Sequence, residues 1–170
     1  LFRLHQLLAA LDAGQFPARW MPDAAYGLGY PFFHYYAGFS IYIAAVFKVL
    51  GFSYVLALKL TQLLGYLVAA GGMFVWIRAA TRNRAAAWVA AAAYTLDAFH
   101  MVNVYVRGDS LAEFWAMGIF PLCMWTAHRL AERTSLARVA ALAASYGALI
   151  LTHNVSALIF TPFLLLYLAL

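Results

Sequence analysis

Apolar residues recur along the first eleven positions of the chain with a helical period. They stand at positions 1, 4, 7, 8 and 11, while Arg3, His5 and Gln6 lie off this stripe. The spacing predicts an amphipathic helix that lies at an interface. Proline and glycine interrupt residues 12–31 throughout, which predicts a loop, and the Trp and Tyr residues of this loop suit the headgroup region of a membrane.

Longer apolar runs follow, several of them with the length of a membrane span. They cover residues 54–77, 85–106, 111–126, 139–151 and 160–170. The fourth run is short unless it begins near Leu136. Residues 32–50 are apolar and aromatic, and their pattern leaves open whether they cross the bilayer or lie parallel to it. We predict an all-α, polytopic helical membrane protein with about four or five spans plus interfacial helices.

The composition supports a membrane protein. Hydrophobic residues make up 66% of the chain and charged residues 10%, which excludes an ordinary soluble domain. The net charge is +5, but the arginines are scattered over short loops, which argues against a nucleic-acid partner and for membrane lipid. The single Cys123 excludes an internal disulfide and a cysteine-based zinc site.

The arginine-rich loops predict an orientation. One loop holds Arg78, Arg82 and Arg84, and another holds Arg129, Arg133 and Arg138; two predicted spans separate them, so they share one side. By the positive-inside rule this side is the cytoplasm. Residues 107–113 and 153–154 then face outward. If 32–50 spans the membrane, residues 1–30 are cytoplasmic; if it does not, both polar regions meet on the outer face.

Three charges stand within a nine-residue segment, 105–113, of this apolar chain: Arg107, Asp109 and Glu113. Such a cluster belongs at a membrane surface or in a polar cavity. The two carboxylates could bind a divalent cation, Mg²⁺ or Mn²⁺, or orient an acceptor hydroxyl. The alternative is an ion pair with Arg107 that anchors a helix end at the interface.

Other polar residues are candidates of the same kind. Arg107 and Arg19 could grip a lipid phosphate, because a guanidinium binds it bidentately; the alternative for both is headgroup anchoring. His153 could contact a donor phosphate or a metal, or serve in a helix cap or turn. His34 lies among aromatic residues and is a weaker candidate of this set.

Asp97 and His100 are three residues apart, which predicts that they share one helical face. If the helix starts near position 85, Asp97 lies about 18 Å along it, near the middle of the bilayer. An ionisable residue at that depth is a functional-site hypothesis. The alternative is an internal hydrogen bond between Asp97 and His100.

Five segments, in order along the chain, resemble a known family. They are Gly14-Gln-Phe-Pro-Ala-Arg-Trp-Met-Pro22, Gly27-Leu-Gly-Tyr-Pro-Phe-Phe-His-Tyr-Tyr36, Tyr105-Val-Arg-Gly-Asp-Ser-Leu-Ala-Glu113, Pro121 and Thr152-His-Asn154. The chain resembles bacterial membrane proteins that carry the label "6-pyruvoyl-tetrahydropterin synthase-related domain", which are similar to the GT-C class of polytopic glycosyltransferases.

The resemblance implies one transmembrane domain over 1–170, with an outer loop and interfacial helices in 1–53 and spans in 54–170. It implies a multi-pass protein of the bacterial inner membrane that moves a sugar from a polyprenyl-phosphate donor to an acceptor at the outer face. Asp109 and Glu113 match the acidic positions at the outer end of a later helix, although Asp109 stands where a small residue is expected. A further acidic residue is expected just before His5, upstream of Leu1, so we expect this chain to be part of a longer protein.

Two other functions remain open from the residues alone. The chain could be a structural or accessory subunit with membrane-protein partners. It could also be part of a transporter, in which Asp97 and His100 would carry protons or substrate at the midplane.

Overall fold

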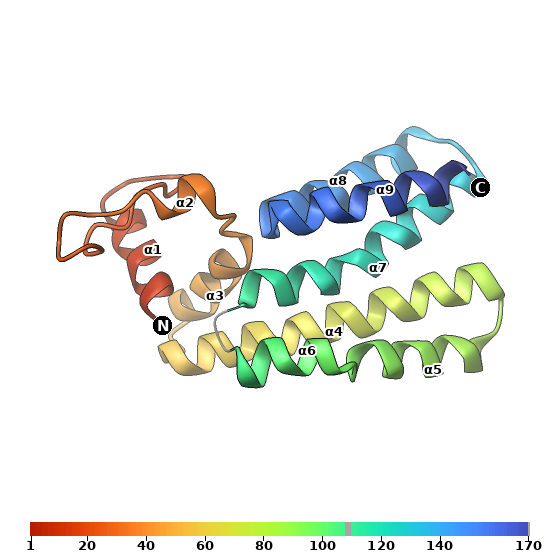
Figure 1. The fold of residues 1–170 in the computed structure, drawn as a ribbon, viewed down its shortest axis with the longest axis horizontal. Coiled ribbons are helices and arrows are strands. Elements are labelled where there is room, and N and C mark those ends of the chain that lie inside the picture. Colours follow the sequence, from red (N-terminus) through yellow and green to blue (C-terminus); the bar gives the residue numbers. More distant parts are fainter. Residues whose placement is uncertain (108–109, 170) are drawn as a thin grey trace. The chain divides into compact units, whose positions relative to one another are not determined.

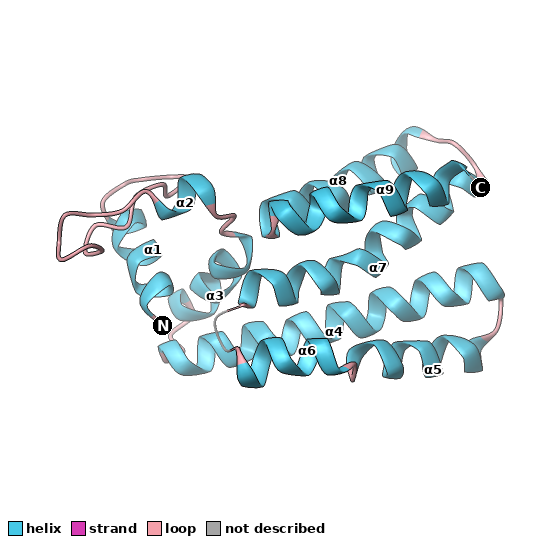
Figure 2. Cartoon of the chain, in the orientation of Figure 1, coloured by secondary structure: helices cyan, strands magenta, loops and turns pink. Residues whose placement is uncertain are grey.

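The computed structural model describes residues 1–107 and 110–169, and this part of the chain is helical, with one isolated β-bridge between Met21 and Tyr30. The all-α prediction is confirmed (Figures 1 and 2). The helices are α1 (Phe2–Asp12), α2 (Phe32–Tyr35), α3 (Phe39–Val49), α4 (Tyr54–Thr81), α5 (Arg84–Thr95), α6 (Ala98–Met101), the π-helix η1 (Val102–Val106), α7 (Leu111–Glu132), α8 (Leu136–Thr152) and α9 (Asn154–Ala169). They form two compact units, Leu1–Leu63 and Leu64–Leu170.

In the first unit, α1 packs against α3. The predicted apolar stripe of α1 is confirmed at Leu4 and Leu7, which are fully buried in a core that also contains Ala44 of α3, whereas Leu1 is exposed and Gln6, expected off the stripe, is buried. The loop between α1 and α2 is fixed to this helix pair by a reciprocal contact. The buried Gln6 side chain donates to the Asp23 carboxylate at 2.8 Å and accepts from the Asp23 amide at 2.8 Å.

Residues 32–50 do not form one continuous helix. The backbone is extended at Tyr36 (φ −112°, ψ 126°), and a new helix begins only after Gly38. The longer piece, α3, has 11 residues and is about 16 Å long, about half the thickness of a bilayer core of about 30 Å. These lengths fit the non-spanning alternative for 32–50. The assignment of 1–53 to the outer side stays a prediction.

Most of the long apolar helices lie in the second unit, and α4 begins in the first unit and continues into the second. Among the described residues, two helical stretches are long and apolar enough to cross a membrane, Tyr54–Thr81 and Arg84–Val106. The second of these is interrupted, because α5 ends at Thr95 and α6 begins at Ala98. The helix α8 begins at Leu136, which gives it 17 residues. The total of about four or five spans stays a prediction.

Small residues bring α4 and α7 into close contact. Gly65 faces the Phe114 ring, and a Cβ atom on Gly118 would lie 3.2 Å from the Gly65 carbonyl oxygen. Such close backbone approach is typical of helix contacts in membranes. Figure 1 shows that, in this unit, the end of η1, the start of α7 and the α8–α9 connection lie at one end, while the α4–α5 and α7–α8 connections lie at the other. The two arginine-rich segments thus lie at one end of this unit, and the side of the membrane that this end faces stays a prediction.

Candidate functional site

An ion pair joins the end of η1 to the first turn of α7. The Nη1 atom of Arg107 donates to Oε2 of Glu113 at 2.7 Å and to Oδ1 of Asn103 at 3.1 Å. Asn103 is 2% exposed, whereas the side chains of Arg107 and Glu113 are 48% and 25% exposed. A buried amide therefore orients a guanidinium whose outer part remains accessible, and the carboxylate lies beside it.

The local backbone explains this arrangement. Between 102 and 106 the helix widens to a π-turn, and the Arg107 amide donates to the Val102 carbonyl at 2.9 Å. The three valines of this segment have a lower helix propensity because they are β-branched. Glu113 stands in the first turn of α7, where the helix dipole stabilises a negative charge. Single π-turns occur often at functional sites.

The Arg107 guanidinium retains donors for a ligand. It carries five N–H groups in a rigid plane, and within residues 1–107 and 110–169 it hydrogen-bonds only through Nη1. The remaining N–H groups suit a phosphate. Glu113 has one oxygen, Oε1, outside the ion pair. The pair can thus bind an anionic group through the arginine and accept a proton through the carboxylate.

The predicted divalent cation stays a prediction. In the part of the chain that the structure describes, no group of three or more His, Cys, Asp or Glu side chains could hold a metal ion. Glu113 alone cannot supply the several oxygen ligands that Mg²⁺ requires, and its charge is matched by Arg107. Asp109, the second predicted carboxylate, lies outside the described residues.

The continuous helix expected through Asp97 and His100 is interrupted at Asp97, and among the described residues no hydrogen bond joins the two side chains. Asp97 is exposed, and its Oδ2 atom accepts from the Phe99 amide at 2.9 Å as the N-cap of α6. An aspartate competes for free amide groups in this way and favours the start of a new helix. The helical spacing therefore does not continue across position 97.

His100 instead lies in a fully buried aromatic contact of the second unit. It is 0% exposed, and its ring centroid lies 4.9 Å from that of Tyr94 and 5.9 Å from that of Phe114, both edge-on. Neither ring nitrogen has a hydrogen-bond partner among the described residues. His100 therefore contacts Phe114, the residue that directly follows Glu113 in the first turn of α7.

His153 caps a helix, which is one of the two roles predicted for it. The Ser156 amide donates to His153 Nδ1 at 3.2 Å, and the Ser156 hydroxyl lies 2.7 Å from the same atom. The Ala157 amide donates to the His153 carbonyl at 3.0 Å. These contacts fix the start of α9 at the end of the second unit that also holds Arg107 and Glu113 (Figure 1).

Arg19 and His34 belong to the first unit. Both are exposed; Arg19 stands in the loop between α1 and α2, and His34 stands in α2 with its ring centroid 6.5 Å from that of Tyr35. Their predicted role in holding a donor phosphate together with Arg107 stays a prediction.

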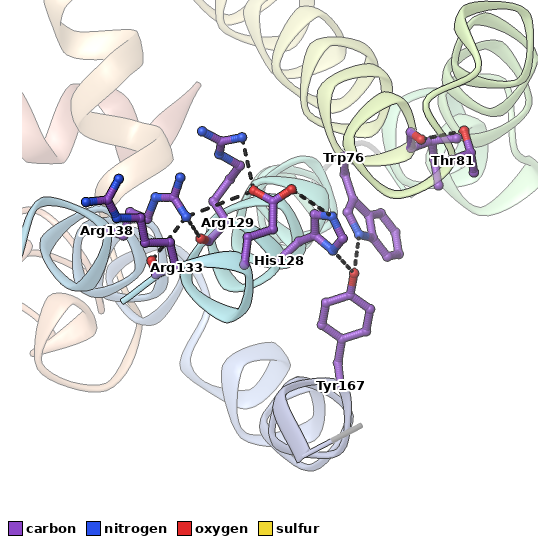
Figure 3. A network of polar contacts seen from close by, with 9 residues as sticks. Trp76, Thr81, His128, Arg129, Arg133, Arg138 and Tyr167 are labelled. Carbon is purple, nitrogen blue, oxygen red and sulfur yellow. Dashed lines mark hydrogen bonds and ion pairs between the residues drawn. The ribbon is translucent and has the colours of Figure 1, made fainter. Parts of the chain in front are cut away.

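Sequence reasoning missed two features. The first is Asn103, whose only signal is its position four residues before Arg107. The second is a polar network at the opposite end of the second unit (Figure 3). There Tyr167 OH accepts from Trp76 Nε1 at 3.2 Å and lies 2.8 Å from His128 Nδ1. Nothing in the sequence relates these three residues, because they come from three helices.

Comparison with known proteins identifies the family. Residues 33–170 match the 6-pyruvoyl-tetrahydropterin synthase related domain, a family of membrane proteins. The chain is 24% identical over 172 residues to an "Uncharacterized protein" of Lactococcus lactis subsp. cremoris (strain MG1363), covering 98% of this chain and 28% of that protein. No solved structure matches. The chain therefore belongs to the 6-pyruvoyl-tetrahydropterin synthase related domain family of membrane proteins.

Proposed function

We propose that this chain forms part of a GT-C-like membrane glycosyltransferase, which moves a sugar from a polyprenyl-phosphate donor to an acceptor at the outer face of the bacterial inner membrane. The observation that carries the proposal is the position of the Arg107 guanidinium, held by the buried Asn103 and by Glu113 with its other donors accessible. Membership of a membrane-protein family and the apolar helices support a substrate that is itself a lipid.

The chemistry proposed for this pair is a displacement at the anomeric carbon. The acceptor oxygen forms the new bond to carbon, and the phosphate leaves with the electron pair of the broken carbon–oxygen bond. Arg107 stabilises the charge of the leaving phosphate. Glu113 takes the proton of the acceptor hydroxyl.

The proposal includes further groups that take no part in the steps above. They are Asp109, Arg19, His34, His153 and a divalent cation. Asp109 would be a second carboxylate, Arg19 and the two histidines would bind the donor phosphate, and the cation would supply further charge stabilisation when bound. Spans over 54–170 and interfacial helices over 1–53 belong to the same proposal.

The test uses the full-length protein in proteoliposomes with radiolabelled polyprenyl-phosphate sugar, and it measures release of free polyprenyl phosphate. We expect Glu113→Gln to lower the rate at least about a hundredfold, the range of general-base catalysis. Arg107→Gln should lower it as well. Glu132→Gln is the matched control, because Glu132 pairs with Arg129 at 3.1 Å at the other end of the same helix. Release by folded Glu113→Gln within threefold of the unaltered protein would overturn the proposal.

The interrupted span favours transport as a second candidate. Discontinuous helices form substrate sites in many transporters, and here the break lies at Leu96 and Asp97. A transporter should lose most activity on Asp97→Asn and little on Glu113→Gln, whereas the transferase predicts the reverse order. A purely structural subunit should tolerate both substitutions at unchanged expression.

A further inference from the structure

Six arginines gather at the end of the second unit that lies away from Glu113. Two of them stand in the α4–α5 and α7–α8 connections and four in the helix ends that flank these connections, and Figure 1 shows the two connections at the same end. The six arginines are Arg78, Arg82, Arg84, Arg129, Arg133 and Arg138. Glu132 is the one acidic residue of the segments 78–84 and 128–138. This end of the unit is therefore strongly basic.

Two of the six arginines are used within the protein. Arg129 pairs with Glu132 at 3.1 Å. Arg138 donates through Nη1 to the carbonyl oxygen of Arg129 and to that of Arg133 at 3.1 Å, which satisfies free carbonyl groups at the end of α7 (Figure 3). These side chains hold the α7–α8 connection in place and have fewer donors left for a ligand.

The other four arginines are free for an external partner. Arg78, Arg82, Arg84 and Arg133 are exposed, and their side chains make no hydrogen bond or ion pair with the described residues. Uncharged groups fix the α4–α5 turn instead: the Asn83 side chain accepts from the Ala85 and Ala86 amides at 2.9 and 3.1 Å. The turn is thus ordered without any help from its arginines.

Aromatic residues beside this basic end indicate its depth in the membrane. The Trp76 indole, two residues before Arg78, donates to the Tyr167 hydroxyl (Figure 3). Trp88, four residues after Arg84, packs on Phe74 with ring centroids 4.8 Å apart. Trp and Tyr concentrate where the hydrocarbon core meets the headgroups. Free guanidinium groups next to such a layer stand at the level of the lipid phosphates.

We propose that Arg78, Arg82, Arg84 and Arg133 bind the phosphodiester headgroups of anionic phospholipids, and that Arg129 and Arg138 serve the fold instead. A guanidinium matches a phosphodiester bidentately. The aromatic layer beside the arginines favours a lipid over a free phosphate. Two short turns on separate helix pairs suit several small headgroups better than one continuous polyanion.

The test measures the binding of phosphatidylglycerol to the purified full chain in mixed micelles with phosphatidylcholine, by native mass spectrometry. The variant Arg82→Gln/Arg84→Gln/Arg133→Gln should bind phosphatidylglycerol at least about tenfold more weakly, since each arginine near an anionic surface contributes about fivefold. The matched control Arg129→Gln/Lys48→Gln/Lys59→Gln removes the same charge and should change binding less than about twofold.

Three outcomes would overturn the proposal. Equal weakening in both triple variants would show that net charge alone attracts the lipid. Unchanged binding in the first variant would show that these arginines do not contact it. Displacement of phosphatidylglycerol by millimolar inorganic phosphate would show a phosphate site without lipid selectivity. Size-exclusion elution and thermal unfolding of each variant in detergent confirm that it is folded.

Discussion

Gly65 of α4 faces the buried ring of Phe114, so a methyl group added there tests how tightly α4 and α7 pack. A Cβ atom on Gly65 would overlap Cε1 of Phe114 and lie 3.1 Å from Cζ. Phe114 is 1% exposed, and its ring is in edge contact with Tyr66 at 4.9 Å and with His100 at 5.9 Å between ring centroids. The ring therefore has little room to move away.

Gly71 in the same helix provides the comparison, because a Cβ atom there would have nothing within 4 Å. Each Gly→Ala change in a helix interior gains about 1 kcal/mol in helix propensity, and this gain cancels between the two variants. Overpacking against Phe114 costs about 1–3 kcal/mol. Gly65→Ala should accordingly be about 1–3 kcal/mol less stable than Gly71→Ala.

The assay is reversible unfolding of the purified protein in mild detergent. A second variant, Gly65→Ala/Phe114→Leu, makes room for the methyl group, and it should be more stable than the sum of the two single changes predicts. Equal stability of Gly65→Ala and Gly71→Ala, or strict additivity in the double variant, would refute the close α4–α7 contact.

Three further substitutions test individual contacts. Asp97→Ala removes the α6 cap and should lower the free energy of unfolding by about 1 kcal/mol, whereas Asp97→Asn retains the cap; unfolding in detergent compares them. Gln6→Leu removes both hydrogen bonds with Asp23 and should therefore speed trypsin cleavage in the loop between α1 and α2. An unchanged cleavage rate would show that these hydrogen bonds do not hold the loop in place. Tyr167→Phe removes a hydroxyl that two side chains share and should cost about 1–3 kcal/mol in unfolding free energy, while Tyr35→Phe, at an exposed position, should cost nearly nothing.

The sequence predicted the long apolar helices in outline, because apolar periodicity and run length are local properties. The amphipathic α1 follows from the periodicity, and the length that a span requires pointed to a start of α8 near Leu136, ahead of the apolar run 139–151. The breaks were harder to predict. An apolar run such as 85–106 gives no warning that the Asp97 carboxylate will cap a new helix, since this depends on competition between side chain and backbone for the same amide groups.

The candidate site was predictable only in part. The charges of Arg107 and Glu113 stand out in an apolar chain, and an ion pair between them was one of the two interpretations. The role of Asn103 depends on the π-turn, and the contacts of Tyr167 depend on how three helices pack. Such contacts join residues that are distant in sequence, so no local pattern reports them.

Ion pairs at the two ends of α7 define the length of the less polar part of this helix. Sixteen residues separate Glu113 from Arg129, which corresponds to about 24 Å of helix. The neighbouring α8 and α9, with 17 and 16 residues, are about 26 and 24 Å long. A typical hydrocarbon core is about 30 Å thick. If α8 and α9 span, these two helices are shorter than such a core, whereas α4 with 28 residues and the stretch Arg84–Val106 with 23 residues are long enough to cross it, so a local thinning of the bilayer is expected beside α8 and α9.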